Sequence, residues 1–385
     1  MFVSASIVTH LPCFHGPLSF HLETGYVGVD EVQFFYYFIE SEGNLAEDPL
    51  LLWATGGPGC SSFCALIFQN GPLKFRSVKY NGSLPTLVYH PFAFACKRYL
   101  WLINHPKFLS NPLYVGGDSY AGKVVPFITQ LISQGTGVPI TFDPEARENT
   151  IRKGYTDLKD TVQRVPAMNR EDYENPTKAL CAKKLQVAEK YFDEINMDHI
   201  LEPKCPPASP KQKNLSGERR SLKDGHNMFT VPPDVPPLKC RSYGYYLSGI
   251  WANDDVVRDA LHIQKKTVPE WIRCNDNLQY AYDLPSNVKY QHKLTSRGYR
   301  ALVYSGDHDL TAPHIGTQTW IRSLNCSIID DWRSWFSGGQ VTGYTRTYAN
   351  NLTFATIYGA GHTGPEYKPR ESLAMVKRWL SYQPL

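Results

Sequence analysis

The chain reads Tyr114-Val115-Gly116-Gly117-Asp118-Ser119-Tyr120-Ala121-Gly122 at residues 114–122. The apolar residues that end at Val115 predict a short strand, the glycines predict a sharp turn, and the periodic apolar residues that follow predict a helix. A serine on a strand–turn–helix junction is typical of a nucleophile elbow. Such a turn needs very small residues two positions before and two positions after the serine. Gly117 and Ala121 meet that need, so Ser119 is the candidate nucleophile.

Two later apolar runs predict strands that deliver an acid and a base. Residues 300–305 lead into Gly306-Asp307, and residues 354–358 lead through three small residues to His362. Taken alone, Asp307 would be a turn residue and His362 an ordinary histidine. Together with Ser119 they follow the order Ser, Asp, His, which is that of α/β-hydrolases rather than of chymotrypsin or subtilisin. We therefore predict an α/β fold of the α/β-hydrolase type, with a mostly parallel central sheet, helices on both faces and the triad Ser119, Asp307 and His362.

A glycine-rich loop supplies the remaining part of an acyl-transfer site. Residues 50–54 predict a strand, and Thr55-Gly56-Gly57-Pro58-Gly59-Cys60 follows it. Acyl transfer needs two backbone N–H groups that point at the developing oxyanion. In this fold one belongs to the residue after the nucleophile, here Tyr120, and the other to such a loop, where Gly57 is the candidate. A phosphate-binding loop is excluded because no Gly-Lys-[Ser/Thr] follows.

Four motifs in this order resemble the serine carboxypeptidase family, and within it the plant serine carboxypeptidase-like group. The resemblance runs from Leu11 to the last residues and implies the α/β-hydrolase fold with a lid over the active site. The motifs are Thr55-Gly56-Gly57-Pro58-Gly59-Cys60-Ser61, Gly117-Asp118-Ser119-Tyr120-Ala121-Gly122, Ser305-Gly306-Asp307-His308-Asp309 and Gly359-Ala360-Gly361-His362-Thr363-Gly364-Pro365-Glu366.

The family contains peptidases and acyltransferases that take an acyl group from a glucose ester. The resemblance implies that peptidases carry Asn where this chain has Thr55, Glu where it has Asp118, and a carboxyl group where it has Gln69. Two close carboxyls can share a proton and recognise a peptide carboxylate, because both cannot ionise together. That pair is absent here, so acyl transfer to an alcohol is the favoured function, with substrate-binding residues Thr55, Gly56, Gln69 and Asp118.

Two other functions stay open from the sequence. One is a serine carboxypeptidase that releases C-terminal residues. The other is an inactive homologue, because residues 92–99 replace a longer family segment that contains an apolar strand, and a Gly-Asn-Pro segment expected after Tyr155 is replaced by other residues. We expect the lost strand to lie in the middle of the parallel sheet, next to the serine-bearing strand, where its loss would leave backbone groups unpaired.

The composition is that of an ordinary globular enzyme. Of 385 residues, 42% are hydrophobic and 20% charged, and the net charge of +4 is spread along the chain, which argues against nucleic acid as a partner. No apolar run approaches the ~20 residues of a membrane span. We predict a small acyl ester or a peptide as the substrate, no cofactor and no metal.

The nine cysteines include no Cys-x-x-Cys pair, which favours disulfides over a metal site. The family resemblance implies a Cys60–Cys274 bridge. Bridges of an inserted region are expected among Cys181, Cys205 and Cys240. The other four cysteines are interpreted as buried free thiols: Cys13, Cys64, Cys96 and Cys326. Asn-x-Ser/Thr triplets predict glycosylation of four residues: Asn81, Asn214, Asn325 and Asn351.

The chain is predicted to be one catalytic core interrupted by an insertion. Residues 1–150 would hold the nucleophile and oxyanion loop, 151–245 the lid and linker, and 246–385 the catalytic Asp and His. Asn253 is a predicted N-cap of a helix that follows it. Family members are generally secreted or vacuolar, and disulfides and glycosylation fit that location. Residues 1–6 lack the apolar stretch of a signal peptide, so either the given sequence begins after it or the protein stays in the cytosol.

Overall fold

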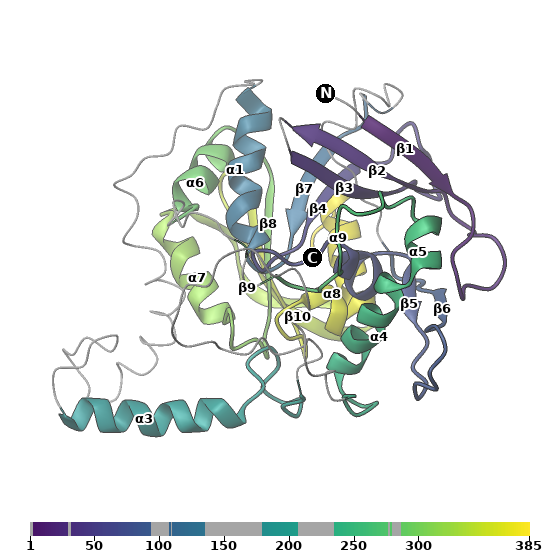
Figure 1. Ribbon diagram of the computed structural model, residues 1–385. Helices are drawn as coiled ribbons and strands as arrows, with labels where there is room; N and C mark the ends of the chain where they lie inside the picture. The colour runs from purple at the N-terminus through teal and green to yellow at the C-terminus, as the bar shows by residue number, and fades with distance from the viewer. Residues whose placement is uncertain are drawn as a thin grey trace.

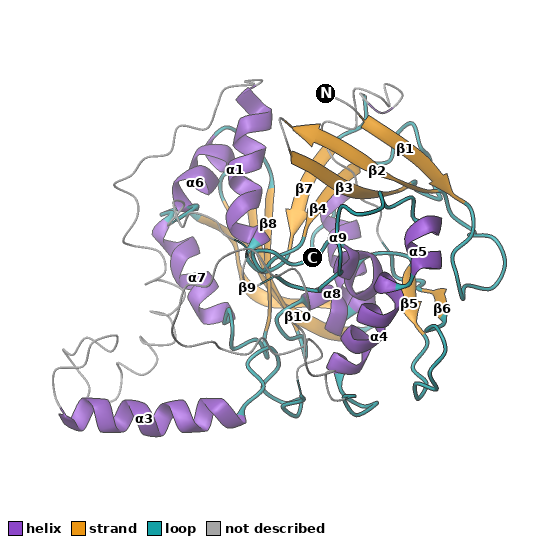
Figure 2. Cartoon of the chain, in the orientation of Figure 1, coloured by secondary structure: helices purple, strands orange, loops and turns teal. Residues whose placement is uncertain are grey.

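Strands through the middle of the molecule separate two groups of helices (Figure 2). The computed structural model describes residues 3–29, 32–93, 108, 110–134, 179–206, 235–275, 278 and 286–385. In the view of Figure 2, helices α1, α6 and α7 lie to one side of the strands, and α4, α5, α8 and α9 lie to the other. This is the layered arrangement of the predicted α/β-hydrolase fold.

Two parallel strand pairs carry the candidate site residues at their ends. Strand β4 (Leu50–Ala54) pairs in register with β7 (Leu113–Gly117). Strand β8 (Ala301–Gly306) pairs in register with β11 (Leu352–Ile357). Because paired parallel strands end at the same edge, the loops that follow each pair leave the sheet side by side.

The flanking strands are antiparallel, and Figure 1 shows β7 and β4 between β8 and β3. The first three strands form one antiparallel group, β9 and β10 extend the pair β8–β11, and β5 and β6 form a hairpin. Their bounds are β1 (Val3–Val8), β2 (Leu22–Val29), β3 (Val32–Ile39), β5 (Leu73–Phe75), β6 (Leu87–Tyr89), β9 (Ile328–Ser337) and β10 (Gln340–Tyr348).

Most helices connect or follow these strands, whereas α3 lies at the edge of the molecule, apart from the sheet (Figure 1). A π-helical turn, Ala65–Gln69, follows the loop after β4. The α-helices are α1 (Ala121–Gln134), α3 (Ala179–Glu194), α4 (Arg241–Asn253), α5 (Asp255–Ala260), α6 (Val288–Ser296), α7 (His314–Ser323), α8 (Gly364–Tyr367) and α9 (Pro369–Leu380).

Strand β11 is buried on both faces, as expected for a parallel strand that helices cover from two sides. Phe354 packs with Ile321 of α7, and both are fully buried. The neighbouring Ala355 and Ile357 pack on the opposite side with Met375 of α9. The strand that delivers His362 is therefore fixed between two hydrophobic clusters.

One expectation about the fold is wrong, and two others are not tested by the described residues. The predicted N-cap Asn253 is wrong: it is the last residue of α4, and Asp254 caps α5 by accepting hydrogen bonds from Val256 N and Val257 N. Apart from residues 92 and 93, the shortened stretch 92–99 lies outside the described residues, so its effect on the sheet stays a prediction. The limits 1–150, 151–245 and 246–385 also stay predictions.

Among the described residues, no helix is both long enough and apolar enough to cross a membrane.

The burial of Phe354 predicts a large effect on stability. Replacing it with alanine removes a fully buried ring and leaves a cavity, which should lower the free energy of unfolding by about 3–5 kcal/mol. The matched control is Phe336→Ala on β9, where the ring is 49% exposed. Guanidinium unfolding followed by fluorescence should show a much lower midpoint for Phe354→Ala only. Equal midpoints for the two variants would contradict this account of the core.

Candidate active site

Ser119 lies on a strained turn between β7 and α1, as the sequence predicts. Its φ is +60°, a conformation that non-glycine residues adopt rarely and that nucleophile elbows use. The turn is tight, since a Cβ added to Gly117 would lie 2.6 Å from the Cβ of Ala121. The serine itself is exposed, so its hydroxyl is presented to a substrate.

His362 reaches the serine from the loop after β11. Its Nε2 lies 2.7 Å from Ser119 Oγ, and its Nδ1 lies 2.9 Å from Asp309 Oδ2. An ionised carboxylate can only accept a hydrogen bond, so Nδ1 carries the proton and Nε2 is free to accept the serine proton. This is the arrangement of a nucleophile, a general base and an orienting acid.

The prediction that Asp307 pairs with His362 is wrong, because the structure places Asp309 there. Asp307 turns toward the chain that leaves β11, where its Oδ1 accepts the Gly359 N–H at 2.7 Å. Two residues later the loop has turned back toward the site. Asp309 is fixed there by the Ala312 N–H, which donates to its Oδ1 at 3.0 Å. The side chain of Asp309 is only 3% exposed.

The charges around His362 favour its protonated form. Burial acts to lower the pKa of His362, but the hydrogen bond and charge of Asp309, followed by the charges of Asp198 and Asp118, outweigh burial and raise it. An imidazolium that forms when Ser119 loses its proton is thus stabilised by its surroundings.

The glycine-rich loop after β4 lies directly against the elbow. A Cβ added to Gly56 would lie 2.6 Å from Ser119 Cβ and 2.9 Å from Tyr120 N. Only glycine permits this approach. The candidate oxyanion donors, the N–H groups of Gly57 and Tyr120, are therefore on segments that touch, although their roles stay predictions.

Asp118 is buried behind the nucleophile at 3% exposure. Tyr304 OH donates a hydrogen bond to its Oδ1, and Oδ2 has no partner among the described residues. Burial raises the pKa of Asp118 to about 7, although the Tyr304 hydrogen bond and the charge of His362 act in the opposite direction. The carboxyl can therefore change its charge near neutral pH.

The two other predicted substrate-binding side chains, Gln69 and Thr55, follow β4 in the chain, and Gln69 is buried whereas Thr55 is half-buried. Gln69 Oε1 accepts a hydrogen bond from Trp53 Nε1 at 3.0 Å. Thr55 Oγ1 is buried and makes no hydrogen bond within the described part of the chain. Buried polar atoms usually have partners, so Thr55 Oγ1 and Asp118 Oδ2 are candidates for contact with a ligand.

Two disulfides form among the cysteines expected to pair. Cys60–Cys274 joins the glycine-rich loop to residues 271–275, where Ser61 N also donates to Arg273 O at 2.8 Å. Cys205–Cys240 closes a bridge within the predicted insertion. The side chain of Cys181 lies outside the described residues. Free thiols in the described part of the chain are Cys13, Cys64 and Cys326. Cys64 is buried as predicted, whereas Cys13 is exposed and Cys326 is half-buried, and Cys96 lies outside the described residues.

Three of the predicted glycosylation residues are described, and all three are exposed: Asn81, Asn325 and Asn351. Asn214 lies outside the described residues. No group of three or more His, Cys, Asp or Glu side chains in the described ranges could hold a metal ion.

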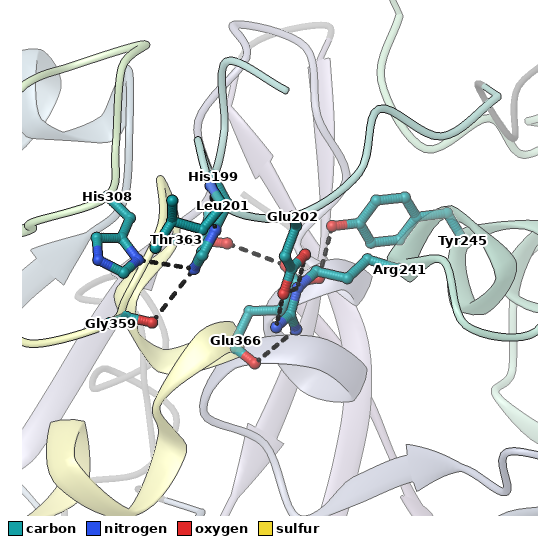
Figure 3. Close-up of polar contacts among 9 residues, drawn as sticks. All are labelled: His199, Leu201, Glu202, Arg241, Tyr245, His308, Gly359, Thr363 and Glu366. Atoms are coloured by element: carbon teal, nitrogen blue, oxygen red, sulfur yellow. Dashed lines mark hydrogen bonds and ion pairs between the residues drawn. The ribbon is translucent and has the colours of Figure 1, made fainter. Parts of the chain in front are cut away.

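A further polar network lies beside the His362 loop and was not predicted from the sequence (Figure 3). In it, Glu202 forms an ion pair with Arg241 at 2.7 Å, and Tyr245 OH donates to Glu366. His199 contacts His308 and Gly359 O. Glu202 and His199 come from the region after α3, far away in sequence, so no local pattern indicated their contacts.

Comparison with known proteins agrees with an active site formed by Ser119, His362 and Asp309. The profile of the serine carboxypeptidase family matches residues 12–96 and 99–382. Serine carboxypeptidase-like 11 of Arabidopsis thaliana is 40% identical over 442 aligned positions, which cover 99% of this chain and 95% of that protein. Serine carboxypeptidase-like 17 of the same plant is 41% identical, with 99% and 94% covered. The aligned positions outnumber the 385 residues of this chain, so these relatives carry extra residues within the aligned region.

A solved structure shows the same fold. Kex1(Δ)p, a prohormone-processing carboxypeptidase from Saccharomyces cerevisiae, matches with a TM-score of 0.59 at 17% sequence identity, covering 94% of this chain and 91% of that one. The break in the family match, at residues 97 and 98, falls in the stretch that the sequence indicated to be short.

The hydrogen bond from His362 predicts different roles for the two aspartates. Asp309→Asn should slow the reaction of Ser119 with a fluorophosphonate by about 10³–10⁴-fold, because the imidazole loses its orienting carboxylate. Asp307→Asn should change the rate only a few-fold, since Asp307 holds the backbone of Gly359. Equal losses in the two variants, measured as labelling rates of folded protein, would contradict this assignment.

The raised pKa of Asp118 predicts a pH-dependent loss of stability. Between about pH 4 and pH 7 this carboxyl is neutral in the folded protein and ionised in the unfolded chain, so folding weakens as the pH rises through this window. The full cost, about 4 kcal/mol, is present above pH 7. The stability of Asp118→Asn relative to wild type should therefore increase from pH 4 to pH 8 in guanidinium unfolding.

The control for this pH series is Asp331→Asn. The backbone N–H of Trp332, followed by Arg346, lowers the pKa of the exposed Asp331, so its contribution to stability changes only below about pH 4. The stability of this variant relative to wild type should therefore stay nearly constant from pH 4 to pH 8. If the stability difference between Asp118→Asn and wild type is independent of pH, Asp118 does not titrate as described.

Proposed function

Because this chain belongs to the serine carboxypeptidase family and brings Ser119, His362 and Asp309 together, we propose that it is a serine acyltransferase. It would move an acyl group from a glucose ester to an alcohol acceptor. The observation that carries the acyl-transfer chemistry is the pair of hydrogen-bond distances at His362, 2.7 Å to Ser119 and 2.9 Å to Asp309.

The first half of the reaction forms an acyl-enzyme. Ser119 Oγ attacks the ester carbonyl while His362 Nε2 takes its proton, and Asp309 stabilises the imidazolium. The backbone N–H groups of Gly57 and Tyr120 would bind the oxyanion, each contributing about 3 kcal/mol to the lowering of the barrier. His362 then returns the proton to the leaving oxygen of glucose, which leaves the acyl group on Ser119.

In the second half an acceptor alcohol replaces glucose. His362 removes the proton of the alcohol, whose oxygen attacks the acyl carbonyl, and the proton then goes to Ser119 as the new ester leaves. A carboxypeptidase runs the same steps with a peptide as donor and water as acceptor. The choice between the two reactions therefore depends on the groups that bind the substrate, not on the triad.

Buried polar atoms of three side chains support transfer from a glucose ester. Gln69 is an amide whose oxygen already accepts from Trp53, so it cannot share a proton with Asp118 to bind a peptide carboxylate. Thr55 Oγ1 and Asp118 Oδ2 are buried without partners in the described residues. Sugar hydroxyls both donate and accept hydrogen bonds, and are suited to such atoms.

A carboxypeptidase is the second candidate, because the solved structure with this fold is named as one. The contacts of His362 with Ser119 and Asp309 argue against an inactive homologue. A protein that had lost its activity would have no need to keep both of these hydrogen bonds. The disulfides Cys60–Cys274 and Cys205–Cys240 also support folding in an oxidising compartment such as the secretory pathway.

The test offers both kinds of substrate to one preparation. The protein is incubated with 1-O-cinnamoyl-glucose and a panel of alcohols and hydroxy acids, and separately with an N-blocked dipeptide. We expect a new cinnamoyl ester and no release of the C-terminal residue, and Ser119→Ala should abolish the ester. Release of the residue without ester formation would contradict the proposal in favour of the peptidase. No turnover of either substrate class by protein that a fluorophosphonate labels would also contradict it.

A further inference from the structure

A short segment of the predicted insertion crosses both loops that carry the acid and the base. This crossing segment, residues 197–200, follows α3. Leu310 N donates to Met197 O at 2.9 Å, and Ile200 N donates to His308 O at 3.0 Å. The segment is thus hydrogen-bonded to the chain on both sides of Asp309.

Asp198 in this segment contacts both catalytic loops. Its backbone oxygen accepts the N–H of His362 at 2.8 Å. Its Oδ1 accepts a hydrogen bond from Thr311 Oγ1 at 3.0 Å, and Thr311 lies two residues after Asp309. One residue therefore fixes the position of the His362 backbone relative to the loop of Asp309.

The next residue, His199, holds the crossing segment in place (Figure 3). It is only 6% exposed, and its ring stacks on Tyr367 with the centroids 5.0 Å apart. Its Nε2 lies 3.3 Å from Gly359 O and 3.3 Å from His308 Nδ1. The segment is also anchored further along the chain by the Glu202–Arg241 ion pair.

The carboxylate of Asp198 also acts on His362 through its charge. It is one of three carboxylates that raise the pKa of His362, against the lowering effect of burial, and the other two are Asp309 and Asp118. Asp198 is an exposed residue, so its effect should be weakened by salt, unlike that of the buried Asp309.

We infer that Asp198 is a positioning residue of the active site, supplied by the insertion, which fixes His362 relative to Asp309 and stabilises the imidazolium. This inference rests on the proposed function of Ser119 and His362. The insertion would therefore contribute to the chemistry as well as cover the site.

Other titratable or charged groups around the crossing segment come from several elements: His199 and Glu202 after α3, Asp307 and His308 after β8, Arg241 and Tyr245 on α4, His314 on α7, and Glu366 and Tyr367 on α8.

The test measures the rate of fluorophosphonate labelling of Ser119 as a function of pH. Labelling needs neutral His362, so its midpoint reports the ionisation of this residue. Asp198→Asn removes a charge that favours the imidazolium, so the midpoint should move to lower pH by about 0.3–0.5 units at low salt. At about 0.5 M salt the shift should become smaller, because an exposed charge is screened. A purely structural role would not give a salt-dependent midpoint.

Three variants separate charge from structure. Asp198→Glu keeps the charge and should restore the wild-type midpoint. Thr311→Val keeps the charge but loses the hydrogen bond, so its plateau rate should fall several-fold with an unchanged midpoint. Asp193→Asn, an exposed carboxylate of α3, is the matched control and should leave the profile unchanged.

The outcomes are distinguishable from failure of the proposed function. An unchanged midpoint in Asp198→Asn, or an equal shift at low and high salt, would overturn the inference. If Asp198→Asn does not fold, an unchanged plateau rate in Thr311→Val overturns it instead. If the wild-type protein is labelled but forms no ester, acyl transfer is contradicted, and the pH midpoints still test the role of Asp198. If folded wild-type protein is not labelled, both the proposed function and the role of Asp198 are contradicted.

Discussion

The parallel pairing of β8 with β11 is the constraint on which the site depends. Their register places Gly306 beside Ile357, so the loops that carry Asp309 and His362 leave the sheet together. The hydrogen bond from His308 N to Ala360 O, at 3.0 Å, keeps the two loops in contact beyond the sheet. The pair β4–β7 does the same for the glycine-rich loop and Ser119. Four segments of the chain thus meet at the ends of the two parallel strand pairs, as α/β folds generally arrange their sites.

Much of the fold and of the candidate site could be predicted from short sequence patterns. Apolar runs that end in glycine indicated β4, β7, β8 and β11, and the order Ser, Asp, His indicated the fold. The elbow was predictable because its chemistry is local: a small residue on each side of Ser119 satisfies the tight turn whatever surrounds it. The Cys60–Cys274 bridge came from family resemblance rather than from spacing.

The errors lie where three-dimensional contacts decide between similar neighbours. Asp307 and Asp309 have the same side chain two residues apart, and only the turn of the loop determines which one faces His362. Asn253 and Asp254 are equally suited to cap α5, and the end of α4 decides between them. No local signal marks Asp198 as part of the site, because the contacts that link it to the site, with Thr311 and His362, are with residues more than 100 positions away. A sequence pattern can identify the residue types of a site more readily than the partners of each residue.

The triad geometry is common to acyl transfer and to peptide hydrolysis. Asp118, Gln69 and Thr55 are the predicted substrate-binding side chains, and the family resemblance implies that peptidases carry other residues at these three positions. Asp118 is the most sensitive of the three, because burial brings its pKa to about 7, within the range in which many enzymes operate. The charge of Asp118 next to Ser119 therefore depends on pH, whereas the hydrogen bonds of the triad are fixed by the fold.

The most direct test of the central claim, that Ser119, His362 and Asp309 form a working nucleophilic site, is to map the position of a covalent label. The wild-type protein is treated with a fluorophosphonate, digested, and analysed by mass spectrometry, with His362→Ala as the control. The account predicts one labelled peptide, modified at Ser119, and its loss in the control. Folded wild-type protein that carries no label, or a label on another serine, would contradict it.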